Sequence, residues 1–364
     1  MRASFIRLLL PILACITAAA CLWLAQNFDL PQLNWISIIL CLIAALSTLH
    51  ALHLWQIKTD AAHLRAAMRR MLVFSLLALL LILAAGSMWI TRSRVQVMIH
   101  PGRTFAEVSY AKTHIPDFQN VQFVTPDGLT LRGWYVPPHN KALVIFLHGH
   151  GGNRQQLALE AGLLVQQGYG ALLYDARNCG ESEGTITTLG LTEVNDMRGA
   201  LQFLQSQPQV DPERIGLLGH SMGGSTALMA AAQIPQVRAV VSESAYASLE
   251  QNIRENLDHL LGLPPFPFAP LVIFWGQQET GLDISQANPV DQISTISPRP
   301  VLIIHGEQDS TILVENAHQL YQAARQPKEL WILPDAMHCC LAQVGGEAYA
   351  QKLLEFFNQA LLSP

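Results

Sequence analysis

The pattern that most constrains the fold lies at 214–233, where the chain reads RIGLLGHSMGGSTALMAAAQ. An apolar run typical of a strand leads into a Gly-x-Ser-x-Gly turn, and an Ala-rich run typical of a helix follows directly. Gly219 and Gly223 predict a backbone that turns sharply and lets another element approach closely. Ser221 is expected at the tip of this turn, where it is either a nucleophile or the cap of the helix.

The rest of the chain beyond about residue 120 repeats this alternation of strands and helices. The expected strands are VQFVT, LTLRGWYVP, ALVIFLHG, YGALLYD, RIGLLG, VRAVVSES, RPVLIIHG and KELWILP, and helical spacing is found at 153–167, 190–206, 222–233 and 314–325. The turn TPDG at 125–128 predicts that the first two strands form a hairpin. The later strands are almost entirely apolar, which predicts an α/β fold with a mostly parallel, eight-stranded sheet and helices on both faces.

Residues 247–297 interrupt this alternation of strands and helices and contain the Pro-rich stretch LGLPPFPFAPLVIFWG. We expect a small cap over the carboxyl ends of the strands, and the alternative is a surface excursion with its own minor core. Ligand pockets are mostly apolar, so four aromatic residues of the cap are expected to wall a substrate pocket. They are Phe266, Phe268, Phe274 and Trp275.

Three nearly uncharged runs precede the globular part, at about 8–25, 35–55 and 71–90. Each is about long enough to cross a hydrocarbon core of ~30 Å, which predicts three transmembrane helices. The expected division is a membrane region at 1–95, a linker at 96–119 and a globular domain at 120–364. A cleaved signal peptide is the alternative for the first run, because basic residues precede it and small residues follow.

Charge predicts the orientation of these helices and excludes one class of partner. The loop at 56–70 carries four Lys or Arg residues and the loop at 26–34 carries none. The positive-inside rule therefore predicts a cytoplasmic amino terminus and a globular domain on the extracytoplasmic side of the membrane. Residues 104–364 hold thirteen Lys and Arg against twenty-five Asp and Glu, which argues against binding nucleic acid.

Two further residues could activate Ser221 as a nucleophile. A serine hydroxyl needs a base within hydrogen-bond reach, and the base needs an acid to orient it. Asp309 follows the strand VLIIHG and His338 follows the last strand, so both are expected beside Ser221 at the carboxyl edge of the sheet. Glu243, which follows the strand VRAVVSE, is the alternative acid.

The loop FLHGHGGN at 146–153 follows a central strand and precedes a helix. We expect it to supply one oxyanion N–H from His150, with a second N–H from Met222. The loop lacks the Lys and Ser/Thr of a phosphate-binding loop. No metal-ligand spacing occurs among the cysteines, so neither a metal nor an organic cofactor is expected, and a disulfide from Cys179 to Cys339 or Cys340 stays open.

Taken together, the motifs LHGHGGN, YDARNCGESEG, GHSMGG, HGEQD and MH resemble those of the α/β-hydrolase-fold serine hydrolases. The resemblance covers about 120–360 and is strongest to membrane-anchored members similar to monoglyceride lipases and serine aminopeptidases. It implies a catalytic triad of Ser221, Asp309 and His338, with His150 and Met222 as oxyanion donors.

These observations predict a membrane-anchored serine hydrolase that cleaves small-molecule or lipid acyl substrates, as esters or thioesters, through an acyl-enzyme intermediate. One alternative is a serine aminopeptidase-like peptidase, in which Glu279 or Asp283 would hold the amino group of the substrate. Another is a non-catalytic membrane scaffold on a hydrolase fold, although a scaffold has no need for all three triad groups.

Overall fold

The computed structural model describes residues 61–363. The runs predicted to cross the membrane at about 8–25 and 35–55 lie outside the described residues. The chain divides into two compact units, Met1–Gly86 and Ser87–Pro364. The boundary between the units falls within helix α3 (Ala61–Ile99). The amino-terminal part of this helix belongs to the first unit, and its last turns belong to the second.

Helix α3 has 39 residues and extends beyond the predicted span of 71–90 at both ends. Ala and Arg residues favour helix before that span, and no proline interrupts the chain until Pro101. Within the described residues, the segment Leu72–Ile99 is long and apolar enough to cross a membrane, with a mean hydropathy of 2.4. The exposed apolar side chains of its first half include Leu72, Phe74, Leu76, Leu80 and Leu81.

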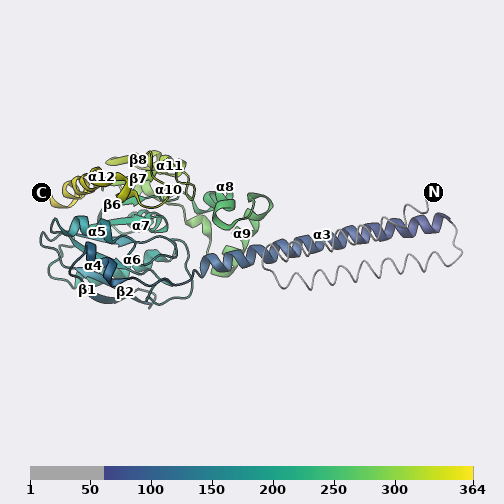
Figure 1. Cartoon of the computed structure of the whole chain (residues 1–364), viewed down its shortest axis with the longest axis horizontal. Helices are drawn as coiled ribbons and strands as arrows, with labels where there is room; N and C mark the ends of the chain where they lie inside the picture. Colours follow the sequence, from purple (N-terminus) through teal and green to yellow (C-terminus); the bar gives the residue numbers. More distant parts are fainter. Residues whose placement is uncertain (1–60, 364) are drawn as a thin grey trace. The chain divides into compact units, whose positions relative to one another are not determined.

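The unit Ser87–Pro364 is built on an eight-stranded sheet of order β1-β2-β4-β3-β5-β6-β7-β8 (Figure 1). The strands are β1 (Gln119–Val124), β2 (Thr130–Val136), β3 (Leu143–Leu147), β4 (Gly170–Tyr174), β5 (Ile215–His220), β6 (Val237–Glu243), β7 (Val301–Gly306) and β8 (Lys328–Leu333). Strand β2 is antiparallel to β1 and β4, and all other neighbours are parallel. The mostly parallel eight-stranded sheet that the sequence predicts is confirmed.

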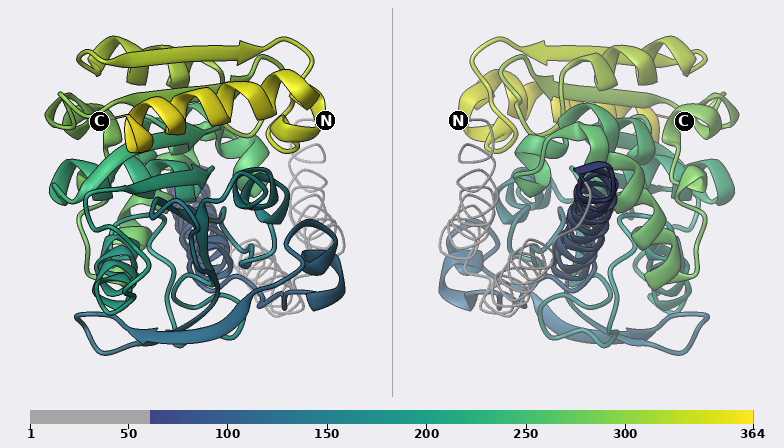
Figure 2. Two further views of the ribbon diagram at one scale, coloured as in Figure 1. Left: turned by 90° about the vertical axis from the view of Figure 1, so that its left-hand side faces the viewer. Right: turned by 90° about the vertical axis from the view of Figure 1, so that its right-hand side faces the viewer.

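Helices cover both faces of the sheet (Figure 2). One layer holds α4 (Val108–His114), α5 (Ala158–Val165), α12 (Leu341–Phe357) and the short η3 (Asn358–Leu362); the other holds α6 (Glu193–Gln205), α7 (Met222–Gln233) and α11 (Glu315–Ala323). Alternate residues of one strand enter opposite cores: in β3, Ile145 packs in one and Val144 and Phe146 in the other. Burial on both faces explains why the parallel strands are apolar throughout.

The interval between β6 and β7, where the sequence predicts a cap, folds into two longer helices followed by three short ones. They are α8 (Leu249–Leu261), α9 (Pro265–Thr280), η1 (Ile284–Gln286), α10 (Pro289–Gln292) and η2 (Ile293–Thr295). The first two meet at 106° and share one apolar cluster with Val95 and Ile99 from the last turns of α3. The expected linker at 96–119 contains the end of α3 and helix α4, and Ile99, Ala111 and Ile115 within it are buried.

Candidate active site

The turn around Ser221 joins β5 to α7 and is shaped by its two glycines. Ser221 has φ 57° and ψ −121°, a backbone conformation that residues with a side chain rarely adopt. A Cβ on Gly219 would lie 2.1 Å from the carbonyl oxygen of Gly223, and one on Gly223 would lie 2.0 Å from that of Leu147. Ser221 stands at the N-cap position of α7, but its side chain makes no capping hydrogen bond. The hydroxyl is therefore free for another partner.

That partner is His338, whose Nε2 lies 2.9 Å from the Oγ of Ser221. The other ring nitrogen, Nδ1, lies 2.8 Å from Oδ2 of Asp309. Asp309 follows β7 and His338 follows β8, so parallel strands bring residues far apart in the chain to one edge of the sheet. The three side chains expected from the sequence thus form one hydrogen-bonded series.

Several groups hold the Asp309 carboxylate in place. Its Oδ1 accepts the backbone N–H groups of Thr311 and Ile312, and Nε2 of the buried His305 lies 3.3 Å from Oδ2. Burial acts to raise the pKa of Asp309, but hydrogen bonds from His305 and His338 outweigh it and hold the pKa well below its ordinary value. The group that faces His338 is therefore a fixed negative charge.

Glu243, the alternative acid, lies in a different environment behind the nucleophile turn. It is buried and accepts a hydrogen bond from the Tyr349 hydroxyl. Burial, with the nearby Glu160, raises the pKa of Glu243 to about 8, and burial lowers the pKa of the adjacent His220 to about 3. Both shifts favour the uncharged forms of the two side chains, and His220 Nδ1 lies 3.9 Å from Oε2 of Glu243. The backbone carbonyl of Glu243 accepts the N–H of Ser221 and so supports the turn.

The two expected oxyanion donors lie on the loop after β3, which carries His150, and at the start of α7, which begins with Met222. A Cβ on Gly149 would lie 3.3 Å from the Cβ of Ser221, so the loop after β3 passes directly against the nucleophile turn. Met222 is the first residue of α7, and an N–H at this position has no acceptor within its own helix. The ring of His150 reaches outward, with Nε2 2.6 Å from the carbonyl oxygen of Met98 in α3.

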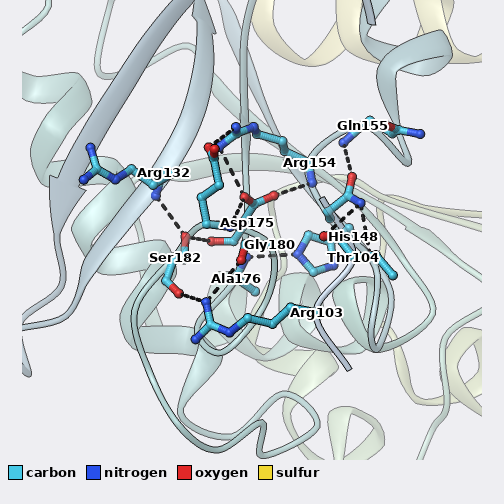
Figure 3. A network of polar contacts seen from close by, with 12 residues as sticks. Arg103, Thr104, Arg132, His148, Arg154, Gln155, Asp175, Ala176, Gly180 and Ser182 are labelled. Carbon is cyan, nitrogen blue, oxygen red and sulfur yellow. Dashed lines mark hydrogen bonds and ion pairs between the residues drawn. The ribbon is translucent and has the colours of Figure 1, made fainter. Parts of the chain in front are cut away.

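A polar network behind these loops was not expected from the sequence (Figure 3). Asp175, fully buried, accepts the backbone N–H of Arg154 at 2.7 Å and its guanidinium at 3.2 Å. His148 accepts the N–H of Ala176 at 2.9 Å, and Arg103 donates to the carbonyl groups of the 180–184 loop. The network ties the loop after β3 to the loop after β4.

The four aromatic residues expected to wall a pocket fall into two groups. Phe266 and Phe274 are 85% and 43% exposed, whereas Phe268 and Trp275 are half-buried against the cap cluster. A cavity of about 30 Å³ lies beside this cluster. It is lined by the last turns of α3, the 187–191 loop and both long cap helices, through Val95, Met98, Ile99, Leu189, Ile253 and Val272. The sequence did not predict that α3 lines this cavity. The only indication of it in the sequence is that two apolar residues, Val95 and Ile99, are four residues apart.

Among residues 61–363, no group of three or more His, Cys, Asp or Glu side chains is arranged to hold a metal ion. Cys179 is buried as a free thiol, and Cys339 and Cys340 are exposed free thiols. The disulfide from Cys179 that the sequence left open is therefore not formed in this structure.

Comparison with known proteins places the chain in a family. A model of the prolyl oligopeptidase family, peptidase family S9, matches residues 161–363, which is more than half of the chain. The chain belongs to the prolyl oligopeptidase family. The members of this family are serine hydrolases with the α/β-hydrolase fold, as the sequence motifs implied.

Individual relatives agree with this membership. The uncharacterized protein YfhR of Escherichia coli K12 is 27% identical over 67% of this chain and 81% of its own length. Polyketide transferase ATR5 of Stachybotrys chlorohalonatus is 28% identical over 67% of this chain and 97% of its own. Among solved structures, the Pyrococcus furiosus esterase Pf2001 superposes with a TM-score of 0.60 at 24% identity, covering 72% of this chain and 99% of the esterase. At that identity the superposition establishes the fold alone.

Proposed function

We propose that this protein hydrolyses carboxylic esters or thioesters through an acyl-enzyme formed on Ser221. The observation that carries the proposal is the hydrogen-bonded series from Asp309 through His338 to Ser221. A helix cap or a scaffold requires no such series, whereas acyl transfer requires a nucleophile, a base and an orienting acid in this order.

The geometry suggests the following steps. Oγ of Ser221 attacks the substrate carbonyl carbon while Nε2 of His338 takes the hydroxyl proton. The N–H groups of His150 and Met222 stabilise the oxyanion that develops on the carbonyl oxygen. His338 then gives its proton to the departing alcohol or thiol, and water repeats the sequence on the acyl-enzyme. Asp309 keeps Nδ1 of the imidazole protonated and stabilises the imidazolium.

Two observations favour an ester over a peptide with a free amino terminus. Glu279, one acidic group that could hold such an amine, pairs with Arg92 of α3 at 2.6 Å. Asp283, the other, accepts the N–H of Ser285 at the start of η1 and a hydrogen bond from Gln277. Both carboxylates already have partners, and neither is needed for an apolar acyl group.

The cavity beside the cap suggests what the acyl group is. Its walls are almost entirely aliphatic, which suits a hydrocarbon chain better than a polar peptide. Met98, one of these walls, contacts the His150 ring through its carbonyl group, which links the cavity to the loop that carries His150. We assign Val95 and Met98 to the acyl pocket, whereas Phe268 and Trp275 pack against the adjacent cluster and do not line the cavity.

The apolar segment of α3 is proposed to anchor the enzyme in a bilayer, with the catalytic unit on the extracytoplasmic side. The support is its length, its mean hydropathy of 2.4 and the exposure of its leucines.

Peptide hydrolysis is the second candidate, because the family model that matches is named for a peptidase. A structure of Pyrococcus horikoshii acylaminoacyl peptidase also superposes on 67% of this chain with a TM-score of 0.54, covering 42% of that protein. An acyl-peptide substrate would use the same triad and would need no group to hold a free amine.

One panel of substrates separates the candidates. Purified protein is assayed on p-nitrophenyl esters of increasing chain length, a thioester, aminoacyl amides and acyl-aminoacyl amides, and is labelled with a fluorophosphonate probe. We expect ester hydrolysis and a single labelled serine, with both lost in Ser221→Ala, while Ser225→Ala, at a buried serine in α7, keeps both. Preferential cleavage of the amides would favour the peptidase. Labelling or ester hydrolysis that persists in Ser221→Ala would leave the scaffold as the better account.

A further inference from the structure

Two adjacent thiols follow His338 directly in the chain. The Sγ atoms of Cys339 and Cys340 lie 3.1 Å apart, and both side chains are exposed. We propose that they form a vicinal dithiol site, which binds trivalent arsenicals and is oxidised to a disulfide, and that the oxidation displaces His338 from Ser221. The effect on activity rests on the proposed function through His338, but the thiol chemistry does not.

The sulfur atoms are already placed for both reactions. A disulfide bond is about 2.05 Å long, so the two atoms need to approach by only about 1 Å. Their exposure lets a reagent reach either one. Cys179, the third cysteine in the described part of the chain, is buried, and burial raises the pKa of its thiol to about 12. Cys179 is therefore a protected thiol in the same molecule.

The chain on either side of the two cysteines is held firmly. Before them, the carbonyl group of Ala336 accepts the N–H of Gln308, and a Cβ on Gly306 would lie 2.3 Å from that same carbonyl oxygen. After them, the buried Leu341 begins α12. A change of backbone at the cysteines is therefore taken up by the few residues in between, and His338 is one of them.

Cys340 is the point at which such a change would begin. It has φ 69°, in the left-handed region that residues other than glycine seldom occupy, and its carbonyl group accepts the N–H of Val344 in the first turn of α12. Linking the two sulfurs closes a small ring through the 339–340 peptide and resets these dihedral angles. Since His338 holds Ser221 at 2.9 Å and Asp309 at 2.8 Å, a shift of about 1 Å breaks the series.

Both reactions balance with a named reagent. With a small disulfide such as oxidised glutathione, one thiolate attacks and releases a thiol, and the second sulfur then displaces the other thiol from the mixed disulfide. The protein loses two electrons and two protons, and the reagent becomes two thiols. With phenylarsine oxide, two As–S bonds form and one water molecule leaves.

The test uses the purified full chain treated with phenylarsine oxide or with oxidised glutathione. Peptide mass spectrometry locates the adduct or disulfide. Fluorophosphonate labelling and hydrolysis of p-nitrophenyl acetate measure the reactivity of Ser221. We expect modification at 339–340 by both reagents, with labelling and hydrolysis slowed roughly 100-fold by the disulfide and restored by a small dithiol. Cys339→Ser and Cys340→Ser should keep the untreated activity and lose the response. Cys179→Ser should respond as the wild type does.

Two results would overturn the proposal. Absence of both the arsenic adduct and the intrapeptide disulfide would exclude the dithiol site. A disulfide at 339–340 with unchanged labelling would exclude the coupling to His338. If the untreated protein neither hydrolysed esters nor reacted with the probe, the proposed function would fail, whereas the mass measurement would still decide whether the dithiol site exists.

Discussion

Nδ1 of His338 lies 2.8 Å from Oδ2 of Asp309, and the other oxygen of that carboxylate accepts two backbone N–H groups. The Asp309 carboxylate is therefore held in one position, and its negative charge orients the His338 imidazole. The site depends on this charge and not only on the size of the side chain at position 309.

Asp309→Asn should reduce kcat for ester hydrolysis by roughly 10³–10⁴-fold, because an amide neither holds Nδ1 protonated nor stabilises the imidazolium. The folded structure should persist, as judged by circular dichroism and urea unfolding. Glu243→Gln is the matched control, since burial of Glu243 favours its uncharged form, and should change kcat far less. A larger loss in Glu243→Gln than in Asp309→Asn would reverse the assignment of the acid.

The pocket assignment predicts that Val95 sets the preferred chain length of the acyl group. Val95 is 2% exposed and lines the cavity, whereas Val97, two residues along the same helix, is 66% exposed. Val95→Trp should lower the octanoate-to-acetate ratio of kcat/KM by at least about tenfold, and Val95→Ala should raise it. Val97→Trp should leave the ratio unchanged. Equal ratios in all four proteins would remove α3 from the pocket.

Stability should fall as pH rises from about 6.5 to 8, because two buried carboxyl groups hold their protons in the folded state. Burial raises the pKa of Glu243 from 4.5 to about 8, and burial raises that of Glu160 to about 7. Below about pH 6.5 the lowered pKa of His220 acts in the opposite direction, because the unfolded chain binds a proton there that the folded chain does not. Between about pH 6.5 and 8 this opposing effect is absent, the unfolded chain has released the carboxyl protons and the folded chain still holds part of them, so the free energy of unfolding decreases. Each group contributes a slope of up to about 1.4 kcal/mol per pH unit.

Urea unfolding at a series of pH values measures this slope. Glu243→Gln should flatten it, because the amide keeps the hydrogen bond from Tyr349 and has no proton to lose. Glu347→Gln, at an exposed position on the same helix as Tyr349, should leave the slope as it is. A slope in the Glu243 variant equal to that of the wild type would show that the carboxyl groups ionise normally.

Arg154 should be essential to stability. Its guanidinium is 7% exposed, pairs with the buried Asp175 and lies 5.0 Å from the centre of the Trp134 ring. Arg154→Met leaves the Asp175 charge buried, which should cost about 3–5 kcal/mol in the free energy of unfolding. Arg254→Met removes an exposed pair with Glu250 and should cost about 0.5 kcal/mol or less. Similar losses in the two variants would contradict the structural role of the network.

The proposed topology is tested by fusing alkaline phosphatase, which is active only outside the cytoplasm, after residue 62 or after residue 100. The basic loop at 56–70 should stay in the cytoplasm, so the fusion at 62 should be silent and the fusion at 100 active. The reverse pattern would place the catalytic unit in the cytoplasm.

Most of the fold could be predicted from local sequence. Strands buried on both faces must be apolar along their length, and glycines that pack against carbonyl groups, such as Gly219 and Gly223, must stay glycines. The order of Ser221, Asp309 and His338 after successive strands also predicted that they meet, because the carboxyl ends of parallel strands share one edge of a sheet.

Other features depended on contacts between residues distant in the chain, and only the tertiary structure decided them. Glu243 ends β6 and Asp309 follows the neighbouring β7, and no local signal shows that the first is buried against Tyr349 while the second faces His338. The packing of Val95 against the cap is equally invisible in the sequence, since an apolar residue at the end of a membrane-type helix suits lipid as well as protein. Sequence determines which groups are available and in what order, whereas burial and partners, which set charge and specificity, arise only when the elements pack.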